Sequence, residues 1–302
     1  MMTSGRAFLA ITASLLAVLS GVCVNFAVKY AADADVPQHT VLFYRFFGGV
    51  ILLTPILFWQ GRKAWVSYHP WLQGGRAVMM IASIALFFWT ISRMPVGVAG
   101  AIQNLSPLFI PLGGWLLLHE KLSLRLFLPV IVGLIGAIIA TESSVPQGDV
   151  LILAAGVLSA ALGGMTAPLG KYLQKHDNLT VLVTWPAFAG LVFAGGWSVV
   201  DGFIWPEVKV MLALSVAGAM GYMGWFLTQW AYTILTSAAI APIRYMAIPI
   251  NLFGAMIFFG EKFTLVTLSG VALIFVGCLL PWVRFRRLRV DLKLFQRWIP
   301  PK

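Results

Sequence analysis

The sequence predicts an all-α polytopic membrane protein, with ten transmembrane helices arranged as two inverted five-helix repeats and both termini in the cytoplasm. Three observations support this prediction: the composition, the recurrence of long apolar runs, and an internal repeat. Of the 302 residues, 60% are hydrophobic and only 10% are charged, and the mean hydropathy is +0.90. Soluble domains do not reach these values.

The apolar runs are long enough to span a bilayer. A transmembrane helix needs roughly 20 apolar residues to cross about 30 Å of hydrocarbon, and nearly uncharged runs of that length recur about ten times. The first continues to about Val28, which is too long for the core of a signal peptide, so we expect a retained span. Short joints rich in turn formers and charges separate the spans. In order, we predict spans at residues 7–28, 38–59, 74–92, 95–118, 122–141, 148–170, 178–200, 208–235, 237–260 and 264–283.

The second half of the chain repeats the first. Residues 87–124 align without gaps on residues 228–265, which pairs Trp89 with Trp230, Gly113 with Gly254 and Glu120-Lys121 with Glu261-Lys262. Each half holds five predicted spans, and because five is odd, the second copy enters the bilayer in the opposite orientation. Many secondary transporters build a midplane site from such a repeat. We therefore divide the chain into a first repeat (1–144), a second repeat (145–284) and a tail (285–302).

The net charge of +11 is distributed as expected for membrane topology rather than for nucleic-acid binding. With the N-terminus inside, fifteen basic residues fall in inner segments or the tail, and four fall in outer segments. The positive-inside rule therefore predicts that both termini are cytoplasmic. The tail mixes cations with Leu288 and Trp298, which suits a helix on an anionic lipid surface, although a plain topology anchor explains it equally.

At this point the sequence resembles a known family. The five-plus-five organisation, the proline-bearing fourth and ninth spans, and the joints "LLLHEKLS" and "FFGEKFT" followed by Gly-rich spans are similar to the EamA family of the drug/metabolite transporter (DMT) superfamily. The resemblance implies ten helices, a central cavity between spans 1–4 and 6–9, and spans 5 and 10 at the periphery. It also implies a multi-pass protein of the cytoplasmic (inner) membrane that carries a small organic compound.

The residues give no sign of an enzyme or of a bound cofactor. All ten acidic residues and all four histidines fall in joints, at span ends or in the tail, so a proton- or sodium-coupling carboxylate is not visible within a span. The spans contain no HExxH, no GxSxG and no aspartate dyad. The two cysteines, Cys23 and Cys278, indicate neither a disulfide framework nor a metal site.

Two arginines inside spans are the main candidates for substrate binding. Arg45 lies in span 2 and Arg244 in span 9, and a cation near the bilayer centre costs at least about 2.5–3.5 kcal/mol. An anionic substrate is one explanation, and the alternative is that each arginine reaches a lipid headgroup or helix carbonyls. In the repeat, Arg244 and Tyr245 match Gln103 and Asn104, which favours a polar cluster at the pseudo-twofold axis, or hydrogen bonds that join the two spans.

Aromatic, proline and glycine residues have both functional and structural interpretations. Stacking on a substrate, and packing or membrane-interface positions, are the alternatives for Tyr44, Trp89, Trp230 and Tyr232. Pro107, Pro111, Pro242 and Pro249 remove backbone donors in spans 4 and 9, which predicts kinks or carbonyls freed toward a cavity, or else simple bending of the helices. We interpret Glu120 and Glu261 as structural carboxylates at helix N-termini. Close helix packing is the simplest role for Gly133, Gly136, Gly270 and Gly277.

The sequence as a whole predicts a secondary transporter that moves a small, anionic or zwitterionic organic metabolite by alternating access, as a monomer or a homodimer. Two alternatives remain open. One is an exporter of neutral or amphipathic compounds in which both arginines are structural. The other is a membrane receptor or scaffold that binds a ligand without carrying it. The predicted partners are the substrate and the bilayer, without nucleic acid, metal or cofactor.

Overall fold

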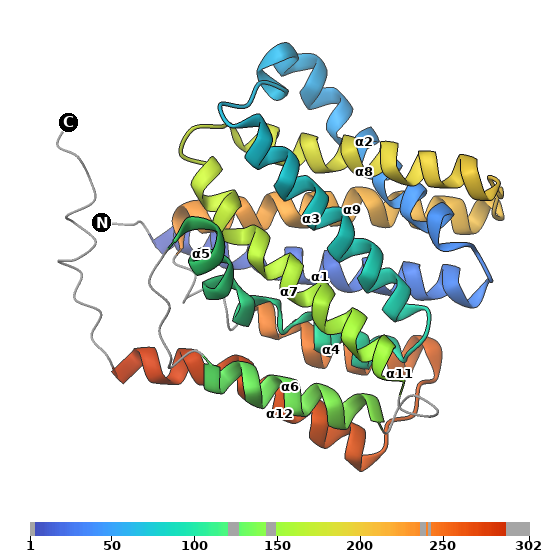
Figure 1. Ribbon diagram of the computed structural model, residues 1–302, viewed down its shortest axis with the longest axis vertical. Helices are drawn as coiled ribbons and strands as arrows, with labels where there is room; N and C mark the ends of the chain where they lie inside the picture. The colour runs from blue at the N-terminus through green and yellow to red at the C-terminus, as the bar shows by residue number, and fades with distance from the viewer. Residues whose placement is uncertain (1–3, 120–126, 143–148, 236–239, 241–242, 288–302) are drawn as a thin grey trace.

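The structure is a computed structural model that describes residues 4–119, 127–142, 149–235, 240 and 243–287. Every regular element in these ranges is helical (Figure 1). The first half of the chain contributes α1 (Ser4–Asp33), α2 (Gln38–Gln60), η1 (Gly61–Ala64), α3 (Pro70–Ile91), α4 (Val96–Gln103), η2 (Ser106–Phe109), α5 (Ile110–Leu118) and α6 (Phe127–Glu142). The second half contributes α7 (Val150–Leu173), α8 (Leu179–Asp201), α9 (Val208–Ile234), α11 (Ala247–Phe259) and α12 (Leu265–Arg287).

Many of these helices have the length and composition of membrane spans. Seven stretches in the described ranges are long and apolar enough to cross a bilayer, and three shorter apolar helices accompany them, at Leu128–Thr141, Ile243–Phe259 and Leu265–Leu280. The predicted class, an all-helical polytopic membrane protein, is therefore confirmed. The number of ten spans and the cytoplasmic location of both termini stay predictions.

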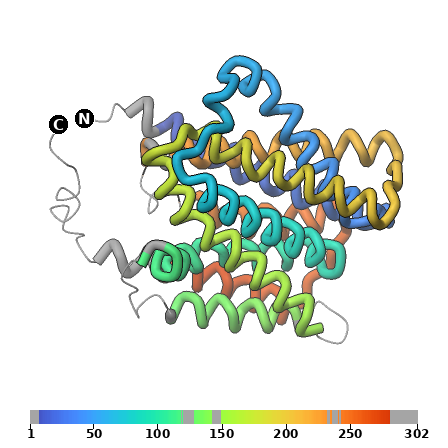
Figure 2. The backbone as a smooth tube through the Cα atoms, turned by 45° about the horizontal axis from the view of Figure 1, so that its top comes forward, coloured from blue at the N-terminus to red at the C-terminus, as the bar shows by residue number. Residues whose placement is uncertain are grey.

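Helices from the two halves of the chain pack against one another. In Figures 1 and 2, α1 runs beside α9, α2 beside α8 and α9, α3 beside α7, α4 beside α11, and α6 beside α12. The main hydrophobic core draws on both halves, with fully buried residues such as Ile102 on α4 and Ile274 on α12. The interface between the halves is therefore the centre of the molecule.

Close approach of the helices depends on glycine. A Cβ at Gly48 on α2 would overlap the carbonyl oxygen of Ser215 on α9. At the α6–α12 contact, a Cβ at Gly136 would lie 2.6 Å from the Gly270 carbonyl oxygen, and one at Gly277 would lie 2.9 Å from the Gly133 nitrogen. The close-packing role predicted for the glycines of spans 5 and 10 is confirmed, and Figure 1 shows α6 and α12 together at one edge of the bundle.

The predicted fourth span is broken in the middle. Helix α4 ends at Gln103, the chain continues through the short 3₁₀ helix η2, and α5 begins at Ile110. Pro107 lies in η2, where its missing N–H and its effect on the preceding residue disfavour a continuous α-helix, so the predicted kink is confirmed there. The break leaves polar side chains at the end of α4 facing the interior. Pro242 lies outside the described residues.

Candidate functional site

A cavity of about 190 Å³ lies between helices of both halves, among α1, α3, α4, α9 and α11. Its apolar lining comprises Ala17, Val18, Gly21, Val22, Phe87, Gly100, Ile240 and Ala247. Its polar lining comprises Ser14, Asn25, Gln103, Asn104, Thr228, Arg244 and Asn251. Among the described lining residues, Arg244 is the one charged side chain. We call this space the central cavity.

Three of the predicted site residues meet in the central cavity. Arg244 comes from the segment before α11, and Gln103 and Asn104 come from the end of α4. Gln103 Oε1 lies 3.0 Å from the Ser159 hydroxyl, which also donates to the Ser83 carbonyl at 2.8 Å, so α4 is joined here to α7 and α3. Asn104 Nδ2 donates to the Gly100 carbonyl at 2.7 Å, which leaves its side-chain oxygen as an acceptor.

Two asparagines of the cavity were not predicted from the sequence. Asn25 Nδ2 on α1 donates to Asn251 Oδ1 on α11 at 3.0 Å, and Asn251 Nδ2 donates to the Ala247 carbonyl at 2.8 Å. Gly100 makes room for this bridge, because a Cβ there would lie 2.8 Å from Asn251 Cγ. The bridge connects the first half to the second. The signal in the sequence was an uncharged amide inside an apolar span, which is weaker than an intramembrane charge or a matched pair of repeat positions.

Arg45 lies away from the central cavity, between α2 and α9. Its Nη1 donates to the Gly218 carbonyl at 2.9 Å, and its guanidinium lies 5.2 Å from the centre of the Tyr222 ring. A Cβ at Gly218 or Gly221 would collide with the backbone or the guanidinium of Arg45, so α9 is shaped around this residue. The contact resembles the predicted alternative, in which the arginine bonds to helix carbonyls.

The predicted aromatic candidates are scattered. Tyr44 is buried among Phe43, Phe47 and Phe203. Tyr245 is buried in the main core. Trp89 lies near the end of α3, where the Arg93 guanidinium stacks 4.2 Å from its ring centre, and Trp230 lies on α9 and is partly buried. The side chain of Tyr232 is outside the described part of the chain. Within the described residues, none of these four aromatic side chains lines the central cavity.

A buried cation was also missed. Arg76 was predicted to lie at the inner surface, yet its side chain is only 2% exposed. Its Nη1 donates to the Leu182 carbonyl of α8 at 3.1 Å, and its guanidinium lies 5.1 Å from the Trp225 ring of α9. Arg76 therefore connects three helices, a role that the sequence pattern did not indicate.

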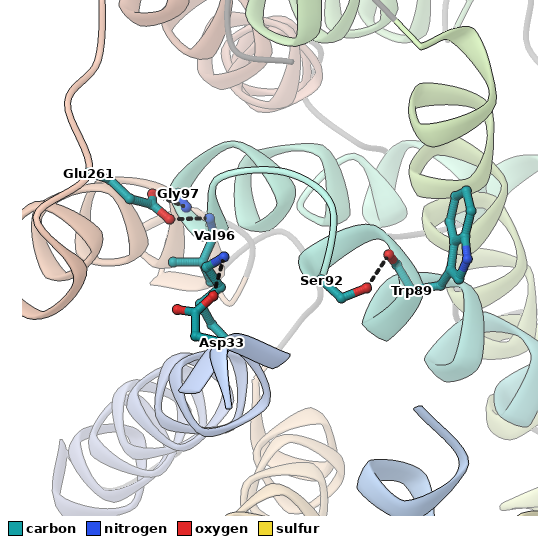
Figure 3. A network of polar contacts seen from close by, with 7 residues as sticks. Asp33, Trp89, Ser92, Val96, Gly97 and Glu261 are labelled. Atoms are coloured by element: carbon teal, nitrogen blue, oxygen red, sulfur yellow. Dashed lines mark hydrogen bonds and ion pairs between the residues drawn. The ribbon is translucent and has the colours of Figure 1, made fainter. Parts of the chain in front are cut away.

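A second, more open cavity of about 370 Å³ lies at the end of the bundle where α1, α3 and α11 end. We call it the vestibule, and its lining residues are Lys29, Asp33, Ser92, Arg93, Met94, Pro95, Phe259 and Glu261. Figure 3 shows the Glu261 carboxylate reaching the backbone N–H groups of Val96 and Gly97. Glu261 thus lies at a helix N-terminus, as predicted, but this helix is α4 of the other half rather than the helix that follows it. Glu120 lies outside the described residues.

Comparison with known proteins gives consistent matches along most of the chain. The sequence profile of the EamA-like transporter family matches residues 6–141 and again residues 149–282. The riboflavin transporter of Brucella anthropi is 27% identical over 244 residues, which cover 78% of this chain and 85% of that protein. The pseudopaline exporter of Pseudomonas aeruginosa is 26% identical, with 88% of this chain and 94% of that protein covered.

Two further matches extend the comparison. The S-adenosylmethionine uptake transporter of Rickettsia bellii is 23% identical over 86% of this chain and 88% of that protein. A solved crystal structure aligns with 93% of this chain and 98% of its own, with a TM-score of 0.65 and 16% identity. At that identity the structural match shows a shared fold. The three named relatives are transporters rather than enzymes, and they come from bacteria.

Proposed function

Because the chain belongs to the EamA-like transporter family, we propose that it is a secondary transporter that moves a small anionic or zwitterionic metabolite by alternating access. It is a multi-pass protein of the inner membrane. The observation that carries the proposal is the central cavity between the two halves, where Arg244 lies among side-chain amides. The repeated family match supports the division into two repeats.

The lining suits recognition of an oxyanion. A guanidinium offers paired N–H donors to a carboxylate or phosphate, and the Gln103 amide adds a neutral donor nearby. Acceptor oxygens of Asn25 and Asn104 suit the donors of an ammonium or hydroxyl group on the same substrate. Movement of one half against the other then exposes the cavity to each side of the membrane in turn.

A flux panel ordered by charge tests the proposal. Purified protein in liposomes is given organic anions, zwitterionic amino acids, riboflavin as a neutral solute and S-adenosylmethionine. We expect saturable flux of anions or zwitterions. Flux of neutral solutes alone would contradict the proposal that the substrate is anionic or zwitterionic. Saturable binding without flux under any gradient would favour the receptor or scaffold.

A neutral, hydrogen-bonding heterocycle is the second candidate substrate. Two relatives are named riboflavin transporters, at 27% and 24% identity. Four side-chain amides line the central cavity, namely Asn25, Gln103, Asn104 and Asn251. Such amides bind the polar edge of a planar ring without needing a net charge. In that case Arg244 donates to a ring carbonyl, and riboflavin gives the largest flux in the same panel.

The orientation is part of the proposal. The asymmetry of the basic residues supports an orientation with both chain ends in the cytoplasm and the tail on anionic lipid, and in this orientation the vestibule faces the outer side. Reporter domains fused at residues 1 and 302 should both report the cytoplasm, and one inserted at residue 145 should report the outside. Opposite locations for the two ends would overturn the ten-span arrangement.

A further inference from the structure

Two buried polar side chains, Gln73 and Arg76, lie one turn apart on the same face of α3. Gln73 is fully buried and Arg76 is 2% exposed. Their hydrogen bonds cross from the first half of the chain to α8 of the second half. Gln73 Nε2 donates to the Val181 carbonyl at 3.2 Å, and the guanidinium of Arg76 donates through Nη1 to the Leu182 carbonyl at 3.1 Å. The same guanidinium lies against the Trp225 ring of α9. We call Gln73 and Arg76 the α3 polar pair.

Each member of the α3 polar pair keeps a polar atom without a partner. Arg76 Nε, a donor, and Gln73 Oε1, an acceptor, are buried and make no hydrogen bond. The orientation of the Gln73 amide follows from its neighbour, because the Val181 carbonyl can only accept, so the unpaired atom is the side-chain oxygen. Buried polar atoms are nearly always paired. A free donor beside a free acceptor therefore matches a ligand that carries both an acceptor and a donor.

The charge of Arg76 has no acidic partner within the described part of the chain. Its neighbours are a carbonyl, an aromatic ring and Gly170, where a Cβ would lie 3.3 Å from Arg76 Nε. Asp177 is the acid described at the end of the bundle where α3 begins, and its carboxylate accepts from the Ser67 hydroxyl and the Tyr68 N–H instead. Burial of the guanidinium keeps lipid headgroups away from it. A charge held inside a membrane protein without a counter-charge is costly and typically marks a substrate pathway.

The α3 polar pair adjoins the central cavity. Trp225, which lies against Arg76, is one turn along α9 from Thr228 of the cavity lining, about 4.5 Å along the helix axis. On α3, Ser83 lies two turns beyond Arg76 and is joined to Gln103 of the cavity through a serine of α7. The pair therefore lies next to the cavity, toward the end of the bundle where α3 begins, which is opposite the vestibule (Figure 1).

We propose that Gln73 and Arg76 form a second recognition site for the substrate, which opens when the two halves part at the end where α3 begins. The inference rests on the proposed function, because it takes the same anionic or zwitterionic substrate. In the structure, carbonyls of α8 bond to both side chains. When α3 parts from α8 these bonds are lost, and the guanidinium binds the carboxylate or phosphate of the substrate through paired N–H donors. The Gln73 oxygen accepts from an ammonium or hydroxyl group of the same molecule.

A purely structural role for the α3 polar pair makes the opposite prediction for transport from this side. If the pair only holds α3 against α8, its loss favours the state that is open at this end. A solute offered there should then half-saturate transport at an unchanged or lower concentration. If the pair binds the substrate, its loss raises the half-saturating concentration on this side. From the vestibule side the pair is covered, so the change there should be small.

The test measures the half-saturating concentration from each side of the membrane. Protein inserted in one orientation in liposomes is offered succinate, L-glutamate, S-adenosylmethionine or riboflavin, and initial flux is recorded from the side where α3 begins and from the vestibule side. For the charged solute that is carried fastest, Arg76→Gln should raise the half-saturating concentration about tenfold or more on the α3 side. The rise on the vestibule side should be less than about threefold. Arg76→Lys keeps the charge without the fork and should lie between Arg76→Gln and the unmodified chain.

A second variant with its own control leaves Arg76 in place. Gln73→Glu puts a carboxylate one turn from the guanidinium, where it competes with the anion of the substrate, so the half-saturating concentration should rise on the α3 side. Gln38→Glu is the matched control, because Gln38 also donates to a carbonyl, that of Ala85, nine residues along α3 from Arg76. This control adds the same charge and should leave the ratio of the two half-saturating concentrations unchanged. Melting temperatures establish that folded protein is compared.

The outcomes separate this inference from the proposed function. Flux of a charged solute, with an unchanged or lower half-saturating concentration on the α3 side in Arg76→Gln, would overturn the second site and leave the transporter standing. If Arg76→Gln does not fold, Gln73→Glu decides between the same two results. Flux of riboflavin alone would reject the charged substrate and the second site together. Absence of flux for every solute would reject the transporter itself.

Discussion

Replacing Arg244 with glutamine is expected to abolish most transport of charged substrates and to lower their apparent affinity well over tenfold. Arg244 is the charged side chain among the described residues of the central cavity. Loss of one partner from a buried charge pair typically costs about 3–5 kcal/mol. Even if the site is partly hydrated, its affinity for the anion should therefore fall by more than a factor of ten. Arg244→Lys keeps the charge but loses the planar fork, so affinity should fall without a comparable loss of folded protein.

Matched variants separate binding from folding. Arg45→Gln changes another arginine of a predicted span, but Arg45 bonds to the Gly218 carbonyl outside the cavity. We expect it to lower the melting temperature and leave the apparent affinity of the folded fraction unchanged. Gln103→Ala should weaken affinity mildly, because it removes only neutral donors. Equal amounts of monodisperse protein are compared in a liposome flux assay, and normal anion transport by Arg244→Gln would show that Arg244 has a structural role.

Replacing Gly48 with alanine is expected to cause a large loss of folded protein. A methyl group there would overlap the Ser215 carbonyl oxygen, which is backbone and cannot rotate away. Helices α2 and α9 would have to separate, and overpacking of this kind typically costs about 1–3 kcal/mol, with more where the backbone itself must shift. Because Arg45 and Gly218 bridge the same two helices, their hydrogen bond should weaken as well.

Gly196 provides the control for this variant. It lies in α8, and a Cβ there would meet nothing within 4 Å. Gly196→Ala should be neutral or slightly stabilising, because alanine favours a helix more than glycine does. Yield and melting temperature in detergent are measured for both. Equal stability of the two variants would mean that the α2–α9 approach is looser than the structure shows.

Part of the site was predictable because the repeat supplies its own alignment. Arg244 matches Gln103 at the offset that pairs Glu120 with Glu261, and the structure brings Arg244 and Gln103 to one cavity. Asn25 and Asn251 were missed because neither is charged and they do not match each other in that alignment. Their 3.0 Å bond joins residues 226 positions apart, and a local pattern carries no information about such a pair.

The sequence alone could not separate Arg45 from Arg244. Both lie about seven residues from the nearer end of a predicted span, so hydropathy treats them alike. The two arginines differ in what they face in the folded protein. Arg45 faces α9 and bonds to the Gly218 carbonyl, whereas Arg244 lines the central cavity. Arg76 was assigned to the inner surface for the same reason, because its burial depends on α8 and α9.

The sequence by itself determined the membrane class, the family, the close packing of spans 5 and 10 and a kink in span 4. These features follow from hydropathy, spacing and backbone chemistry, which act over a few residues or through a visible repeat. Only the tertiary structure decided which groups meet across the halves. Glu261 was predicted to lie at a helix N-terminus, yet the helix is α4, whose Val96 is 165 residues away in the sequence. The tertiary fold decides which unsatisfied N–H groups lie nearest to the Glu261 carboxylate.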